Sequence, residues 1–125
     1  MRITVRHDSE TPIYRQVAEQ LKSLLAGGSL KEGDSLPSVR QLALDLGVNL
    51  NTIAIAYREL QSEGLIQIRH GSGAVVSSRR TQVHAAETKV RLRAALTDLM
   101  LAGLDRTAIL SLVTDELRHL RKGEL

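Results

Sequence analysis

The stretch LPSVRQLALDLGVNLNTIAIAYRELQSEGLIQIRHGSGAVV, residues 36–76, decides the fold of this chain. Its first part predicts a short helix over residues 38–46. Ser38 and Gln41 have the S-x-x-Q spacing of a capping box, in which each side chain satisfies a free backbone N–H at the helix start. Gly47 can adopt the left-handed conformation that ends such a helix. The apolar face of this helix consists of Val39, Leu42, Ala43 and Leu46.

A second helical pattern follows almost at once. Asn49 can cap it, and Gly64 stops it. Its apolar residues recur at helical spacing and predict an inner face buried against the rest of the domain. Two helices joined by a tight turn that contains glycine form a helix-turn-helix, whose second helix enters the major groove of DNA. The inner face of the second helix consists of Ile53, Ala56, Tyr57 and Leu60.

The last part of the stretch, residues 65–76, changes its period. Ile66 and Ile68 alternate with polar residues, a glycine-rich HGSG segment interrupts, and an apolar run resumes at Ala74. This pattern predicts a β-hairpin. A helix-turn-helix followed directly by a hairpin is a winged helix, so the predicted fold class is mainly α with a small β-wing.

The segment before residue 36 completes the predicted domain. Residues 2–6, RITVR, alternate polar and apolar and predict a short strand. Thr11 then caps a helix with Pro12 at its first position, where proline's missing N–H costs nothing. The inner stripe of this helix is Ile13, Val17, Leu21, Leu24 and Leu25, and Gly27–Gly28 ends it. We therefore expect a winged helix-turn-helix DNA-binding domain over residues 1–78.

Residues 79–125 predict a separate helical region after a small, basic linker. Helical periodicity returns near Val83, a first helix closes around Gly103, and Asp105 caps a second one. Two helices cannot enclose a core, and apolar surface of this kind usually needs a partner. We expect a C-terminal two-helix dimerisation region that makes the protein a homodimer. The residues expected to bury on dimerisation are Val90, Leu92, Leu96, Leu99, Ile109, Leu112, Val113 and Leu117.

Composition narrows the classes of protein. The 125 residues include no cysteine, which leaves no disulfide and no thiolate metal site. We find neither a signal pattern nor the ~20-residue apolar run that spans a bilayer, so we expect a cytoplasmic protein without a membrane partner. The net charge of +3 favours a polyanionic partner. The only aromatic residues are Tyr14 and Tyr57, too few for the stacking platforms of single-strand and RNA binders, which favours double-stranded DNA.

Residues 11–77 resemble the GntR family of bacterial transcription regulators. The resemblance rests on PIYRQVAEQL, on the run LPSVRQLALDLGVNLNTIAIAYRELQSEGLI, and on HGSG, in that order and at family spacing. The short tail is similar to the YtrA-type subgroup. The resemblance implies a sequence-specific regulator, by default a repressor, that binds a palindromic operator, often at genes for ABC transporters. It also implies that Arg40, the arginine of L-P-S-x-R, contacts DNA.

The residues suited to meet DNA lie on the outer sides of the two helices and on the wing. A bidentate arginine–guanine contact by Arg40 supplies about 1–3 kcal/mol of discrimination. Asn51 and Thr52 can hydrogen-bond base edges or phosphate. Leu50, Ala54 and Ile55 offer only apolar contact, for example with thymine methyls, and the family often has more polar residues there. For Ile55, packing against the wing or the first helix is an equal alternative.

Arg69 beside the wing tip suits a narrow minor groove, and small residues at the tip let the hairpin approach DNA. The predicted DNA-binding residues are Ser38, Arg40, Asn49, Leu50, Asn51, Thr52, Arg58, Arg69, His70, Gly71 and Gly73.

An enzyme is the competing class, but the sequence carries no motif for one. The four histidines are dispersed, no H-E-x-x-H pattern occurs, and no serine or cysteine nucleophile signature is present. We therefore predict no catalytic residues, no metal and no cofactor. A second alternative is a winged helix used for protein–protein contact or as an architectural DNA-binding module. A small-molecule effector stays open, although the tail is too small to enclose a typical ligand pocket within one subunit.

Overall fold

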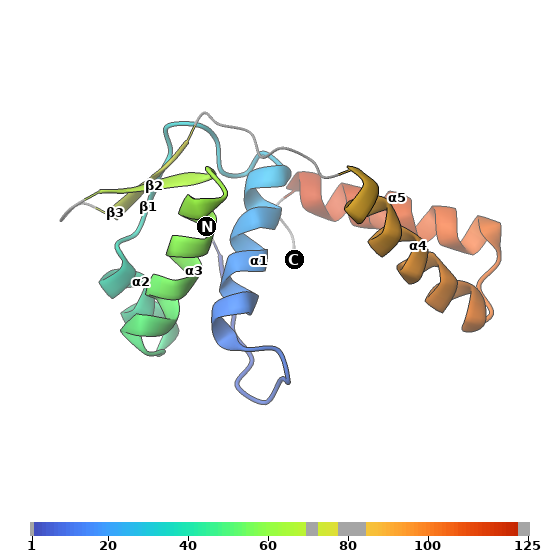
Figure 1. The fold of residues 1–125 in the computed structure, drawn as a ribbon, viewed down its shortest axis with the longest axis horizontal. Coiled ribbons are helices and arrows are strands. Elements are labelled where there is room, and N and C mark those ends of the chain that lie inside the picture. Colours follow the sequence, from blue (N-terminus) through green and yellow to red (C-terminus); the bar gives the residue numbers. More distant parts are fainter. Residues whose placement is uncertain (1, 70–72, 78–84, 123–125) are drawn as a thin grey trace. The chain divides into compact units, whose positions relative to one another are not determined.

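The computed structural model describes residues 2–69, 73–77 and 85–122. The chain divides into two compact units, a winged-helix unit and a helical unit that contains α4 and most of α5. In chain order the elements are α1 (Ile13–Ala26), β1 (Ser35–Leu36), α2 (Val39–Leu46), α3 (Leu50–Ser62), β2 (Ile66–Arg69), β3 (Gly73–Val76), α4 (Ala85–Leu101) and α5 (Arg106–Lys122) (Figure 1). The predicted fold class, mainly α with a small β-wing, is confirmed.

The core of the winged-helix unit forms around α3, which packs against α1, α2 and β2. All four residues of its predicted inner face are fully buried, at 0% exposure. On α1 the predicted stripe is also inside, with Val17, Leu21 and Leu24 buried and the remaining two residues half-buried. The complete cluster of buried residues is Val17, Ala18, Leu21, Leu36, Leu42, Ala43, Ile53, Ala56, Tyr57, Leu60, Ile66 and Ala74.

The predicted hairpin exists, but it belongs to a three-stranded antiparallel sheet of order β1-β3-β2. Within the hairpin, Ile66 pairs with Val76 and Arg69 pairs with Gly73. The two-residue strand β1, which the sequence did not predict, places Leu36 opposite Ala74 on the other side of β3. The wing is therefore anchored along both edges of β3, directly beside the start of α2.

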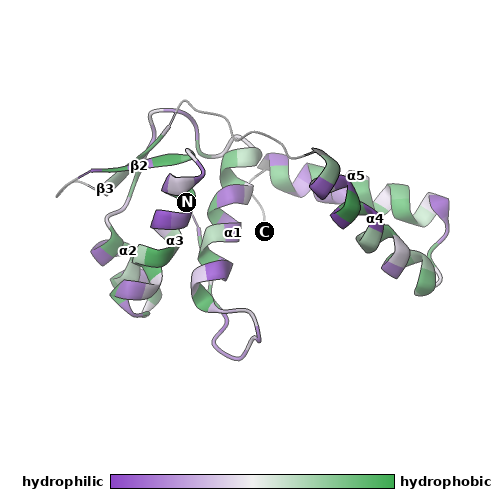
Figure 2. Cartoon of the chain, in the orientation of Figure 1, coloured by the Kyte–Doolittle hydropathy of each residue, from purple (hydrophilic) through white to green (hydrophobic). Residues whose placement is uncertain are grey.

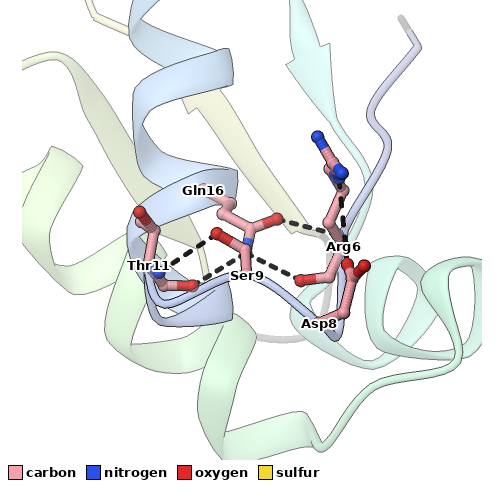
Figure 3. A network of polar contacts seen from close by, with 5 residues as sticks. All are labelled: Arg6, Asp8, Ser9, Thr11 and Gln16. Carbon is pink, nitrogen blue, oxygen red and sulfur yellow. Dashed lines mark hydrogen bonds and ion pairs between the residues drawn. The ribbon is translucent and has the colours of Figure 1, made fainter.

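The predicted strand over residues 2–6 is wrong, because its backbone pairs with side chains of α1 instead of a sheet. Gln20 accepts from the Thr4 N–H at 3.0 Å and donates to the Thr4 carbonyl at 2.6 Å. Gln16 does the same for Arg6, at 2.8 and 3.0 Å (Figure 3). Four helical residues rise about 6 Å and two extended residues span about 6.6 Å. The side-chain amides of Gln16 and Gln20 therefore have the spacing needed to bond the backbones of Arg6 and Thr4, two residues apart in the N-terminal segment.

The predicted start of α1 is also displaced by one residue. Pro12 occupies the N-cap position, its side chain cannot cap, and its carbonyl accepts the N–H groups of Arg15 and Gln16, both at 3.1 Å. Thr11 does not cap with its hydroxyl. Its backbone N–H donates to Ser9 Oγ at 3.1 Å, and its carbonyl accepts from the Gln16 amide at 2.8 Å (Figure 3). Both backbone groups of Thr11 are therefore used to connect the N-terminal segment to α1.

The helical unit contains the turn that the sequence predicted. Gly103 has a φ of +96°, and the Asp105 carboxylate accepts from the Ala108 N–H at 2.9 Å, as an N-cap. In the single chain Leu112, Val113 and Leu117 of α5 are exposed and Ile109 is half-buried, so their burial on dimerisation stays a prediction. Both helices carry hydrophobic residues along much of their length (Figure 2). No helix among the described residues is long and apolar enough to cross a membrane.

Candidate nucleic-acid interface

The first turn of α2 presents Arg40 to solvent. Ser38 caps the helix as predicted, because its hydroxyl accepts from the Gln41 N–H at 3.0 Å. Only this half of the capping box forms, since the Gln41 amide donates to the Asp45 carboxylate at 2.8 Å instead of returning to residue 38. One satisfied N–H is enough to fix the helix start, and Arg40 projects from the exposed side of that turn.

Tyr57 connects the start of α2 to the core. Its ring is fully buried in α3, and its hydroxyl donates to the Pro37 carbonyl at 2.7 Å. Burial disfavours the phenolate and raises the pKa of Tyr57 well above its ordinary value, so the hydroxyl remains a donor. The sequence predicted Tyr57 as a core residue. It gave no signal for this positioning contact, which joins residues 20 positions apart.

The N-terminal turn of α3 forms the centre of the exposed surface. The Asn49 side chain accepts from the Asn51 N–H at 2.8 Å and caps the helix as predicted. Gly47, with a φ of +67°, ends α2 just before it. Beyond the cap, Leu50 is 45% exposed and the Asn51 side chain also faces solvent, while Thr52 is partly buried. The turn of the helix-turn-helix is thus fixed by local hydrogen bonds that leave these side chains outside.

Further along the outer side of α3 lie one exposed apolar side chain, Ile55, and one exposed cationic side chain, Arg58. Ile55 is 42% exposed, so it does not pack into the core. Arg58 is exposed, and its Nε donates to the Ala54 carbonyl one turn earlier at 3.3 Å. This bond lays the Arg58 side chain back along the helix toward its N-terminus and leaves its terminal nitrogens available.

The wing approaches α2 through a glycine. Gly73 has a φ of +81°, a conformation that favours glycine. A Cβ at this position would lie 2.7 Å from the Leu36 carbonyl oxygen and 3.3 Å from the Ser38 nitrogen. Only glycine therefore allows β3 to lie this close to the start of α2. Opposite it on β2, Arg69 is exposed. The predicted residues His70 and Gly71 lie outside the described residues.

These three elements converge on one open hollow of about 480 Å³. It brings together five of the predicted residues, from α2, α3 and the wing. Two arginines line it, and its lining contains no acidic residue, so it favours an anionic partner. Asn51, Thr52 and Arg58 lie along α3 outside its lining. The residues around the hollow are Ser38, Val39, Arg40, Leu50, Tyr57, Ile68, Arg69 and Gly73.

Chemically, this surface suits binding to a negatively charged polymer such as a nucleic acid. A protruding helix end flanked by arginines has the form that enters a major groove, and an exposed arginine on the adjacent strand can reach the backbone or a second groove. Within the described ranges, no group of three His, Cys, Asp or Glu side chains is placed to hold a metal ion.

Comparison with known proteins agrees with this geometry. The profile of the bacterial regulatory proteins of the gntR family matches residues 13–76. The HTH-type transcriptional repressor YtrA of Bacillus subtilis (strain 168) is 40% identical over 101 residues, 78% of either chain. The crystal structure of a transcriptional antiterminator from Listeria monocytogenes EGD-e has a TM-score of 0.85 at 28% identity and covers 100% of this chain and 96% of that one. AraR(DBD) in complex with operator ORX1 has a TM-score of 0.54 at 26% identity, over 62% of this chain and 96% of that one.

Proposed function

This chain belongs to the gntR family of bacterial regulatory proteins and is a DNA-binding transcriptional regulator rather than an enzyme, and we propose that it acts as a homodimeric repressor on a palindromic operator. In this proposal residues 1–78 are the DNA-binding domain and residues 79–125 are the dimerisation region. Bound over a promoter, the dimer excludes RNA polymerase.

The observation that carries the proposal is the convergence of Arg40, Leu50 and Arg69 on one hollow without acidic residues. We propose that Arg40 contacts a guanine and that Asn51 contacts a base edge. Arg58 reaches the phosphate backbone, and Arg69 enters the minor groove beside the wing. The AraR relative, whose fold is similar, was crystallised with its operator, which supports duplex DNA as the partner. Ser38 and Asn49 support the site mainly as caps, because their side-chain oxygens already accept backbone N–H groups.

The exposed apolar residues of α4 and α5 support the homodimer. Val90 is 64% exposed, Leu92 56% and Leu117 62%. Fully burying one leucine or valine side chain contributes about 1.5–3 kcal/mol, so covering several of them in a second copy is a large driving force. A two-fold dimer presents two α3 helices, which fits a palindromic operator with half-sites one helical turn or a multiple of it apart.

Genes for membrane transport are the proposed targets, on the resemblance to YtrA-type regulators. If an inducer exists, we propose that it binds the dimer and changes the angle between the paired winged helices. Isothermal calorimetry of the intact dimer with candidate metabolites tests this point, and an absence of binding across the panel argues against an effector.

The test of the main proposal is a fluorescence-anisotropy titration against duplex DNA from the protein's own upstream region, beside a scrambled duplex and a salt series. We expect Arg40→Ala to weaken binding to the specific duplex by roughly 5- to 150-fold, the equivalent of about 1–3 kcal/mol. Lys22→Ala is the control. It removes one positive charge at the other end of α3, where Lys22 pairs with Glu63 at 2.9 Å, and should retain the preference.

Two outcomes of the titration would contradict a sequence-specific regulator. Equal binding to both duplexes, with salt dependence alone, favours an architectural role. An absence of binding at low salt favours a protein-interaction module.

Light scattering of the same samples tests the homodimer, and a monomer in solution contradicts it.

A further inference from the structure

We propose that the recognition helix α3 identifies thymine by its C5-methyl group, using Leu50 and Ile55. The inference rests on the proposed function, because it names the chemical group read at that same site. It assigns to two apolar residues a role that is usually given to polar side chains. The operator half-site then contains thymines at the positions facing these two residues.

The first observation is that both side chains are exposed on the side of α3 that faces away from the core. Leu50 is 45% exposed and Ile55 is 42% exposed, whereas the inner residues of the same helix have no exposure. Residues four apart on a helix are neighbours on its surface, so Leu50 lies next to Ala54, and Ile55 lies next to Asn51. Leu50 and Ile55 are five positions apart and are therefore not direct neighbours. They present two separate apolar contacts on the part of the helix that enters the groove.

The second observation is that two polar atoms near these side chains are already bonded within the chain. The Asn49 oxygen accepts from the Asn51 N–H, and Arg58 Nε donates to the Ala54 carbonyl. The Asn51 amide is exposed and can bond a base edge near the helix start, and the terminal nitrogens of Arg58 remain available for phosphate. In the major groove the thymine C5-methyl is the one apolar group that distinguishes a base pair. Each of the two exposed apolar side chains is complementary to that group.

The third observation locates the contact. Leu50 and Arg40 together line the hollow of about 480 Å³ and also a second one of about 340 Å³ between α2 and the turn. Neither lining contains an acidic residue. Leu50 is therefore a neighbour of the arginine that is proposed to bind guanine. We place the thymine contacted by Leu50 close to that guanine, and the thymine contacted by Ile55 at a different position in the half-site.

The experiment uses duplexes that the full-length chain selects from a randomised pool. Each thymine of the selected half-site is replaced in turn by deoxyuridine, which removes the methyl group and leaves base pairing unchanged. Burying one methyl-sized group contributes about 0.8 kcal/mol, so we expect the Kd to rise about fourfold at one or two positions. In Leu50→Ala the effect should disappear at one of these positions, and in Ile55→Ala at another.

The control is Lys22→Ala, whose side chain pairs with Glu63 at the other end of α3 and which should keep the full dependence on the methyl groups. Thermal unfolding of each variant checks that the fold is retained. A selected consensus whose affinity is unchanged by deoxyuridine at every position overturns the thymine inference and leaves the regulator proposal intact. A pool that yields no consensus overturns both. Loss of dimerisation in Leu50→Ala or Ile55→Ala, with methyl dependence retained, assigns these residues to a protein contact and also overturns the inference.

Discussion

The close approach of the wing to α2 predicts that Gly73→Ala is far more damaging than a glycine substitution elsewhere in the same unit. Gly73 has a φ of +81°, and an added Cβ would lie 2.7 Å from the Leu36 carbonyl oxygen. Gly33 provides the matched control. Its φ is +87°, and nothing lies within 4 Å of its Cβ position. The two substitutions impose the same backbone strain, but only Gly73→Ala brings a Cβ too close to the Leu36 carbonyl oxygen.

The magnitude follows from these distances. Left-handed backbone costs an alanine about 1–2 kcal/mol, which applies to both variants. Both also gain about 0.4–1 kcal/mol from a less flexible unfolded chain. Ordinary contact begins at 3.4 Å, so in Gly73→Ala the Leu36 carbonyl must move by 0.7 Å, the difference between 3.4 and 2.7 Å. Crowding of that kind costs about 1–3 kcal/mol, and we expect Gly73→Ala to be less stable than Gly33→Ala by that amount.

Tyrosine fluorescence during urea or thermal unfolding measures this difference selectively. Tyr14 and Tyr57 are the only aromatic residues of the chain, and both lie in the winged-helix unit. A unit of this size loses about 4–8 °C of Tm per kcal/mol, so Gly73→Ala should unfold at least about 4 °C below Gly33→Ala. Equal losses in the two variants would refute the argument that the wing requires glycine to reach the start of α2.

Three further predictions concern the contacts that support this surface. Tyr57→Phe should lower the free energy of unfolding by about 1 kcal/mol at neutral pH. Because burial raises the pKa of Tyr57, the unfolded chain loses this proton at a lower pH than the folded chain does. The stability advantage of the wild type should therefore shrink above about pH 10, as urea titrations across pH would measure. Asn49→Ala should cost about 1 kcal/mol and Asn49→Ser much less, by the same titration. Gln20→Ala should release the backbone of Thr4, giving faster trypsin cleavage near the N-terminus than in wild type.

Local features of the fold were predictable because their signals lie within a few residues of one another. Ser38 and Asn49 bond to N–H groups two or three positions away, and Gly47 adopts its left-handed conformation at the end of α2. The inner faces of the helices followed from periodicity alone. These are the cases in which residue type and spacing already contain the physical cause.

The features that were missed depend on contacts between distant segments. Strand β1 has only two residues and exists because Leu36 pairs with Ala74. Gln20 holds a segment 16 residues away, and such a pairing leaves no periodic signal in the sequence. For the candidate site, the sequence named the residue types, but only the hydrogen bonds show which polar groups are engaged. The Nε of Arg58, for example, is bonded to the Ala54 carbonyl.

The three residues that precede Val39 and Arg40 explain why an arginine on so short a helix can be held in one place. Leu36 is extended because a proline follows it, and this conformation lets it pair with β3. The Pro37 carbonyl accepts the hydroxyl of Tyr57, which ties the turn to the core. Ser38 then caps α2. Each residue contributes a different property, and together they join the wing, α3 and α2 at one point. The segment LPS therefore positions Arg40 by backbone contacts, while Arg40 supplies the charge and the hydrogen-bond donors.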